Sequence, residues 1–126
     1  MMVNSDSMSW TEYRDRIAAG AIVFLPVGAH EQHGPHLPMA TDAIFARTMA
    51  TRVAEALNGI VLPVLSYGYK SQPRSGGGQT FTGTISLDAQ TLTRTVLDIL
   101  RELSRHGVRK CVVVNGHYEN QWFITE

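Results

Sequence analysis

The chain alternates short apolar runs with longer amphipathic segments, and this alternation constrains its fold more than any other feature. Three apolar runs have the length and character of buried strands: 21–27, 60–65 and 111–114. The segments predicted to be helical lie between and around them: 10–19, 41–57, 88–105 and an opening turn in 119–126. Strands that alternate with amphipathic helices indicate a parallel sheet with helices on its faces. We therefore expect an α/β fold whose strands are buried.

Local signals refine these elements. Ser9 followed by Glu12 has the spacing of a capping box at the start of the first helix. Pro63 places the second apolar run at a sheet edge or a bend, and residues 84–87 form a candidate short strand. In the helix over 41–57, apolar residues recur every fourth position and define its predicted apolar face: Phe45, Met49, Val53 and Leu57.

Composition excludes several classes of function. The 126 residues make one small domain at most, and 11 basic residues balance 11 acidic ones. A net charge of zero argues against a nucleic-acid footprint and against polybasic membrane attachment. Cys111 is the single cysteine and is interpreted as a small buried hydrophobe. With no secretory leader and no apolar stretch of membrane-spanning length, the sequence predicts a cytoplasmic protein.

Charged residues make up only 17% of the chain, which is low for so small a protein. A small domain exposes a large share of its surface and needs charge to keep that surface in water. We therefore expect that a partner covers part of the surface, or that the chain belongs to something larger.

Polar side chains follow two of the predicted strands at the points where those strands end. Glu31, His33 and Asp42 follow the first strand, and His117 and Glu119 follow the last. In open α/β sheets, sites form at the carboxyl ends of the strands. Two imidazoles and three carboxylates at one sheet edge could hold two divalent ions, with one carboxylate bridging; zinc and manganese suit such nitrogen and oxygen ligands. Two such ions would activate a shared water, so hydrolysis is the natural reaction class.

Each group also has a plainer interpretation. Asp42, next to Thr41, could cap the second helix, Glu31 and His33 could be solvated loop residues, and 117–119 could be a polar helix start. Their convergence on one sheet edge favours the metal site over these alternatives.

Other polar features are less specific. His30 and His36 are expected in loop or outer hydrogen bonds, and His106 at a helix end is expected to be structural. The glycine-rich loop 70–78 lacks the ending of a P-loop; it either lets backbone approach a small ligand or is simply flexible.

These residues lie in longer runs that resemble a known family. The run LPVGAHEQHGPHLPMATD resembles the signature of the creatininase (creatinine amidohydrolase) family, and YGYKSQPRSGGG and RHGVRKCVVVNGHYEN resemble the members that act on creatinine itself. The similarity extends from Trp10 onward. It implies a three-layer αβα sandwich with a mainly parallel sheet, a homohexamer, and two zinc or manganese ions. The implied reaction is hydrolytic opening of the creatinine lactam ring to creatine, by attack of a metal-bound hydroxide.

The resemblance also implies a role for each ligand. Glu31 and His117 would bind one ion, His33 and Glu119 would bind the other, and Asp42 would bridge the two.

Two further roles concern the substrate. Ser75 and Tyr118 fall where the family contacts its substrate, and Glu119, with Tyr118, is the candidate catalytic group. The wider family has Gly-Gly where this chain has Tyr118-Glu119, and a histidine and a proline where this chain has Thr80 and Thr82 beside Phe81. Tyr118-Glu119 favours creatininase proper, whereas the threonines leave the pocket wall undefined.

Family members are about twice as long as this chain. We therefore expect residues 1–126 to be the N-terminal part of a single domain whose C-terminal half is absent, so that this chain alone can be inactive. The alternatives are a family member acting on another small amide, such as a formamide or a peptide, a non-catalytic metal-binding fragment, or a purely structural module.

Overall fold

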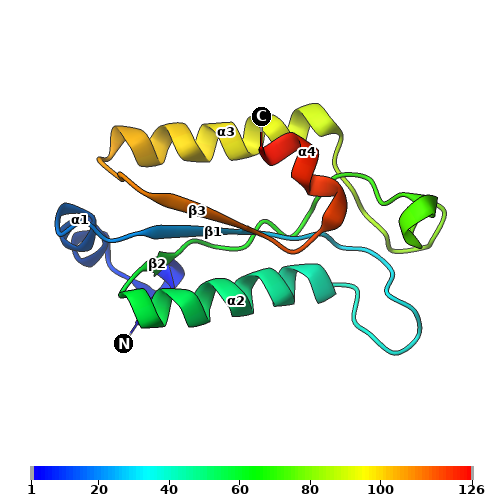
Figure 1. Ribbon diagram of the computed structural model, residues 1–126, viewed down its shortest axis with the longest axis horizontal. Coiled ribbons are helices and arrows are strands. Elements are labelled where there is room, and N and C mark those ends of the chain that lie inside the picture. The colour runs from blue at the N-terminus through cyan, green and yellow to red at the C-terminus, as the bar shows by residue number, and fades with distance from the viewer. Residues whose placement is uncertain (1, 126) are drawn as a thin grey trace.

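The computed structural model describes residues 2–125 and has the predicted alternation of strands and helices (Figure 1). The helices are α1 (Trp10–Ala18), α2 (Thr41–Leu57), α3 (Ala89–Arg105) and α4 (Gln121–Ile124). The strands are β1 (Val23–Val27), β2 (Ile60–Val61) and β3 (Cys111–Asn115). Single 3-10 turns lie at Ser5–Ser7, Pro73–Ser75 and Tyr118–Asn120.

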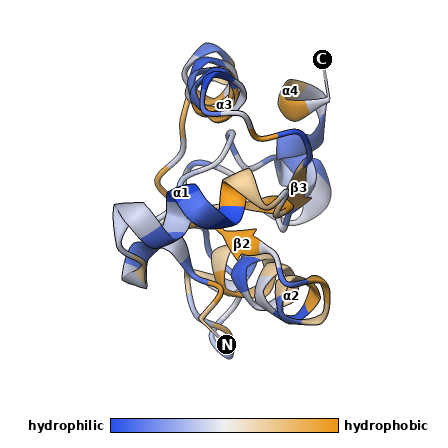
Figure 2. Cartoon of the chain, turned by 90° about the vertical axis from the view of Figure 1, so that its left-hand side faces the viewer, coloured by the Kyte–Doolittle hydropathy of each residue, from blue (hydrophilic) through white to orange (hydrophobic). Residues whose placement is uncertain are grey.

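The described strands form a parallel sheet in the order β2-β1-β3, with Val23 opposite both Ile60 and Cys111. α2 covers one face of this sheet, and α3 with α4 covers the other (Figure 1). Side chains alternate along β1, so Phe24 packs toward Ala50 and Ala54 of α2. Leu25 packs on the opposite side, toward α3. Figure 2 shows the apolar strands between the two helical layers. The predicted αβα arrangement is confirmed.

The predicted apolar face of α2 does not pack on the sheet. Phe45 is 57% exposed and Leu57 is 55% exposed, and Met49 and Val53 are also exposed. The buried face consists instead of small residues: Ala43, Ala46, Ala50 and Ala54. Alanines let the helix axis approach the strands closely, so close packing outweighs the larger apolar area of the other face.

The strands also differ from the prediction. β1 is fully buried, but β3 lies at a sheet edge and is only half-buried, with Val112 exposed. β2 is shorter than its apolar run because Pro63 interrupts it, and it lies at the other edge as predicted. Residues 84–87 make single bridges to His30 and Tyr69 rather than a strand.

Two further local predictions concern Ser9 and Cys111. Ser9 accepts a hydrogen bond from the backbone of Glu12, as the capping-box spacing predicts. Cys111, interpreted from the sequence as buried, packs against the core but is only half-buried, because β3 lies at a sheet edge. No helix in the range 2–125 is long and apolar enough to cross a membrane.

Candidate metal centre

Two glycines place the first turn of α2 against the ends of β1 and β3. A Cβ at Gly28 would lie 2.5 Å from Ala43 Cα, and a Cβ at Gly116 would lie 2.2 Å from the Asp42 carbonyl oxygen. Neither position has room for a side chain, so the helix comes into backbone contact with both strand ends. This contact carries the Asp42 carboxylate to the sheet edge where the other predicted ligands lie.

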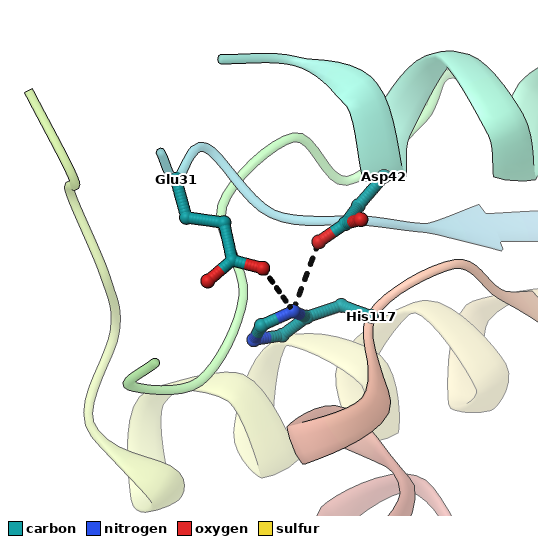
Figure 3. Close-up of side chains that lie close together, drawn as sticks. All are labelled: Glu31, Asp42 and His117. Carbon is teal, nitrogen blue, oxygen red and sulfur yellow. Dashed lines mark hydrogen bonds and ion pairs between the residues drawn. The ribbon is translucent and has the colours of Figure 1, made fainter. Parts of the chain in front are cut away.

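Glu31, Asp42 and His117 meet at that edge (Figure 3). His117 Nδ1 lies 2.9 Å from Asp42 Oδ2 and 3.1 Å from Glu31 Oε1. The imidazole is buried, with 2% of its side chain exposed. One ligand atom from each residue lies within 4.8 Å of the other two, which is close enough for all three to hold one ion. Residues distant in the sequence, on a loop, a helix and a strand end, are thus brought together.

Asp42 faces two histidines at once. While Oδ2 lies next to His117, Oδ1 lies 3.0 Å from His33 Nε2. The α2 N-cap position is Ala40, which makes no side-chain capping bond. Thr41 donates its hydroxyl to the Pro38 carbonyl. The capping interpretation of Asp42 is therefore wrong.

Glu119 is buried on the other side of the His117 ring. Its Oε2 lies 3.5 Å from His117 Nε2. Its Oε1 accepts hydrogen bonds from the Gln72 backbone N–H, at 3.2 Å, and from the Ser75 hydroxyl. The glycine-rich loop therefore holds this carboxylate, so the loop is an ordered part of the site.

The cluster opens into a cavity of about 480 Å³. His33, Ser75, Glu119 and Tyr118 line it, and Tyr118 is 65% exposed with its ring 5.5 Å from that of Trp122. A larger hollow of about 1030 Å³ lies beside α1, but no carboxylate lines it. The smaller cavity is the one lined by the predicted ligands and is the candidate site.

The close contacts shift two pKa values in opposite directions. Burial disfavours the charged carboxylate of Glu31, but hydrogen bonds from His117 and Ser71 outweigh it and lower the pKa of Glu31 to about 2. Burial likewise disfavours the charged imidazole of His117, but hydrogen bonds to Asp42 and Glu31 raise its pKa to about 10. The Nδ1 proton of His117 thus lies between two carboxylates, whose negative charge also favours a metal cation there.

This donor set fits a divalent ion. Imidazole nitrogen and carboxylate oxygens are the ligands that zinc and manganese accept, and the ion would replace the proton on Nδ1. The remaining ring nitrogen, Nε2, lies 2.9 Å from the Tyr69 carbonyl oxygen, an acceptor of the kind that orients metal-binding histidines.

Metal binding should therefore release a proton. Because the pKa of His117 is raised to about 10, this residue is charged at neutral pH and must lose about one proton when an ion binds. The apparent affinity for zinc should rise about tenfold per pH unit between roughly pH 6 and 9. Calorimetry in buffers of different ionisation enthalpy measures the release, and His106→Ala, on the exposed end of α3, should not change it. Binding without proton release would contradict the raised pKa of His117.

Several residues of the site have no clear signal in the sequence. Ser71 is buried and accepts a hydrogen bond from the Gly78 N–H, which anchors the glycine-rich loop. Gln32 donates a hydrogen bond to the Gly76 carbonyl and so ties the two loops together.

The two loop histidines are expected in loop or outer hydrogen bonds. His30 Nδ1 bonds the Gly83 carbonyl, as expected for a loop histidine, and His36 is exposed.

Comparison with known proteins places this arrangement in a family. The family description "Creatininase: Creatinine amidohydrolase" matches residues 6–126, nearly the whole chain. The chain belongs to the creatininase family. The resemblance predicted from the sequence motifs is thereby confirmed.

Individual relatives agree with this assignment. The creatinine amidohydrolase of Pseudomonas putida is 55% identical over 120 residues, which cover 94% of this chain and 46% of that protein. A mycofactocin precursor peptide peptidase of Mycobacterium tuberculosis (strain CDC 1551 / Oshkosh) is 35% identical over 108 residues, covering 82% of this chain and 43% of that protein. The chain thus spans about half the length of the curated relatives it matches.

Solved creatininase structures share the fold. A crystal structure of creatinine amidohydrolase superposes with a TM-score of 0.96 at 55% identity, covering 98% of this chain and 48% of that one. A manganese form of creatininase gives a TM-score of 0.97 at 52% identity, covering 100% of this chain and 49% of that one. A zinc–zinc form of a mutant creatininase gives a TM-score of 0.96 at 51% identity, covering 99% of this chain and 49% of that one. These structures confirm the predicted fold class.

Proposed function

We propose that the whole protein is a creatinine amidohydrolase that opens the lactam ring of creatinine to give creatine. The observation that carries the proposal is Asp42, whose two oxygens face His33 and His117, in a chain 55% identical to a creatinine amidohydrolase. A carboxylate whose two oxygens face different histidines can bridge two ions, one beside each histidine. The zinc–zinc and manganese forms of related creatininases support two divalent ions of these kinds as cofactors.

The proposal assigns one ion to Glu31 and His117, the other to His33 and Glu119, and the bridging role to Asp42. The cluster of Glu31, Asp42 and His117 supports the first site and the bridge. The 3.0 Å contact between His33 and Asp42 supports the second. Glu119 lines the same cavity as His33, and its Oε2 lies 3.5 Å from His117 Nε2.

When bound, two ions would polarise the lactam carbonyl and lower the pKa of a water molecule. In hydrolysis the water oxygen bonds to the carbonyl carbon, the ring C–N bond breaks, and a proton passes to the ring nitrogen. Glu119 is buried at the cavity wall and is the group we assign to carry that proton, since a carboxylate can take it from water and return it to nitrogen. A residue of the whole protein outside this chain is the alternative. Ser75 and Tyr118 line the same cavity and are assigned to contact the substrate.

Ser75→Ala tests the substrate contact. Loss of one hydroxyl hydrogen bond to the substrate should raise KM for creatinine about tenfold and change kcat less. Ser104→Ala, an exposed serine on α3, is the matched control and should change neither. If Ser75 acted only by holding Glu119, kcat would fall with KM unchanged, and the assigned substrate contact would be wrong.

The relatives also support an alternative. The mycofactocin precursor peptide peptidases are 35% to 36% identical to this chain, so a peptide amide is the second candidate substrate. A formamide is a further candidate substrate, and metal binding without catalysis is a further candidate function. Turnover of creatinine, a small peptide and a formamide by the zinc- or manganese-loaded whole protein separates them. Creatinine should be hydrolysed with the highest kcat/KM, and a higher value for the peptide would overturn the assignment.

We further propose that residues 1–126 are part of a single creatininase-like domain and that the whole protein is a cytoplasmic homohexamer. The matches over about half of each relative support the first point. The exposed apolar side chains of α2 support a covered surface in the assembled protein.

A further inference from the structure

Asn120 is a fully buried polar side chain beside the candidate site. It is 0% exposed and lies at the end of the 3-10 turn that carries Glu119. Its Nδ2 donates to the Gly28 carbonyl, at 3.0 Å, and to Asn115 Oδ1, at 3.2 Å. Its Oδ1 accepts the Tyr69 N–H at 2.8 Å. One amide thus links the ends of β1 and β3 to the loop at Tyr69.

Tyr69 connects Asn120 to His117 through its backbone. The Tyr69 N–H donates to Asn120, while the Tyr69 carbonyl accepts from His117 Nε2 at 2.9 Å. The packing is tight around this link: a Cβ at Gly68 would lie 2.4 Å from the Gly28 carbonyl and 2.7 Å from Asn120 Oδ1. Asn120 thus holds the peptide that precedes the Tyr69 carbonyl, together with the Leu87 N–H, which donates to the Gly68 carbonyl at 2.8 Å.

A second path runs through Asn115. The same Oδ1 that accepts from Asn120 also accepts the His117 N–H at 3.1 Å, and Asn115 Nδ2 donates to the His117 carbonyl at 2.7 Å. The Asn120 side chain therefore reaches both the backbone and the ring of His117 through Asn115 and Tyr69. The backbone N–H of Asn120 also donates to the His117 carbonyl at 3.1 Å.

We propose that Asn120 is a positioning residue that fixes the His117 ring with Nδ1 toward Glu31 and Asp42. It does so by holding the Tyr69 carbonyl as the acceptor for Nε2–H, which leaves Nδ1 as the nitrogen that binds the ion. This inference rests on the metal site of the proposed function and adds which nitrogen coordinates and which residue selects it. Hydrogen-bonded partners of this kind orient metal ligands and tune their affinity.

The test measures zinc affinity and the coordinating nitrogen in the same samples. Asn120→Ala should weaken zinc binding about 10- to 100-fold. Long-range ¹H–¹⁵N spectra of the histidine-labelled, zinc-loaded protein should show zinc on Nδ1 of His117 in the wild type and a mixture of Nδ1 and Nε2 in the variant. Leu103→Ala, which removes core packing at the opposite, amino ends of the strands, is the control for lost stability and should keep Nδ1 coordination.

A second variant guards against failure to fold. Asn120→Asp keeps the oxygen that accepts the Tyr69 N–H but loses the donors to the Gly28 carbonyl and to Asn115 Oδ1. It should retain Nδ1 coordination through the Tyr69 path. Zinc bound through Nε2 in the wild type would overturn the inference without any variant. So would an Asn120→Ala protein that binds zinc through Nδ1 with wild-type affinity, and in that case the proposed function would stand. A wild-type protein that binds no zinc or manganese would overturn both.

Discussion

Replacing Asp42 with alanine should remove the second divalent ion and reduce creatinine hydrolysis by more than about 100-fold. Loss of an outer partner of a metal ligand already costs about 10- to 100-fold, and Asp42 faces both histidines directly. The metal content of the loaded protein, measured by elemental analysis, should fall from two ions per chain to one or none. Steady-state turnover of creatinine measures the accompanying loss of activity.

Two variants make this result specific. Asp42→Asn keeps the size of the side chain but loses the negative charge, so it should also bind fewer ions than the wild type. Asp88→Ala removes an exposed acid from the start of α3 and should leave metal content and turnover unchanged. A metal content of two ions per chain in Asp42→Ala would contradict the bridging role.

The second large effect is expected from Gly28→Ala. The added Cβ would lie 2.5 Å and 2.6 Å from the Ala43 Cα and N atoms, which are backbone atoms that cannot rotate away. The free energy of unfolding should fall by about 3 kcal/mol or more, at the upper end for overpacked sites. Because the clash pushes α2 away from β1, Asp42 should leave the cluster and zinc affinity should fall as well. Chemical denaturation and zinc titration measure the two effects.

A glycine without a close neighbour supplies the control. Gly107 has φ +89°, and a Cβ added there would meet no atom within 4 Å. Gly107→Ala should therefore cost only backbone strain, roughly 1 to 2 kcal/mol, and leave zinc affinity unchanged. If Gly28→Ala were as stable as the wild type, the close contact between α2 and the strand ends would not be what positions Asp42.

The order of elements follows from the sequence because local signals and packing agree. The helix over Thr41–Leu57 has in the structure the bounds that its pattern predicts. The face of α2 that packs on the sheet cannot be predicted in the same way, since a stripe of large apolar residues does not show what the stripe packs against. Phe45 and Leu57 are exposed, while Ala46 and Ala50 face the sheet, because small side chains permit the closer approach.

The candidate ligands can likewise be predicted from the sequence. The residues that hold those ligands in place cannot. Glu31, Asp42 and His117 are expected together because parallel strands carry their following loops to one edge. Asn120 escapes prediction because a lone asparagine in a polar turn gives no signal of burial. Its importance comes from contacts with Gly28 and Tyr69, which are distant in the sequence and adjacent only in the fold.

We propose above that this chain contributes the ligands of a two-ion, creatinine-opening site. The measurement that tests it most directly is creatinine turnover by the whole protein, stripped of metal and then titrated with zinc or manganese. Turnover should be absent from the stripped protein, rise with added ion and level off at two ions per chain. A fully loaded protein that produces no creatine, or full activity in the stripped protein, would contradict the account.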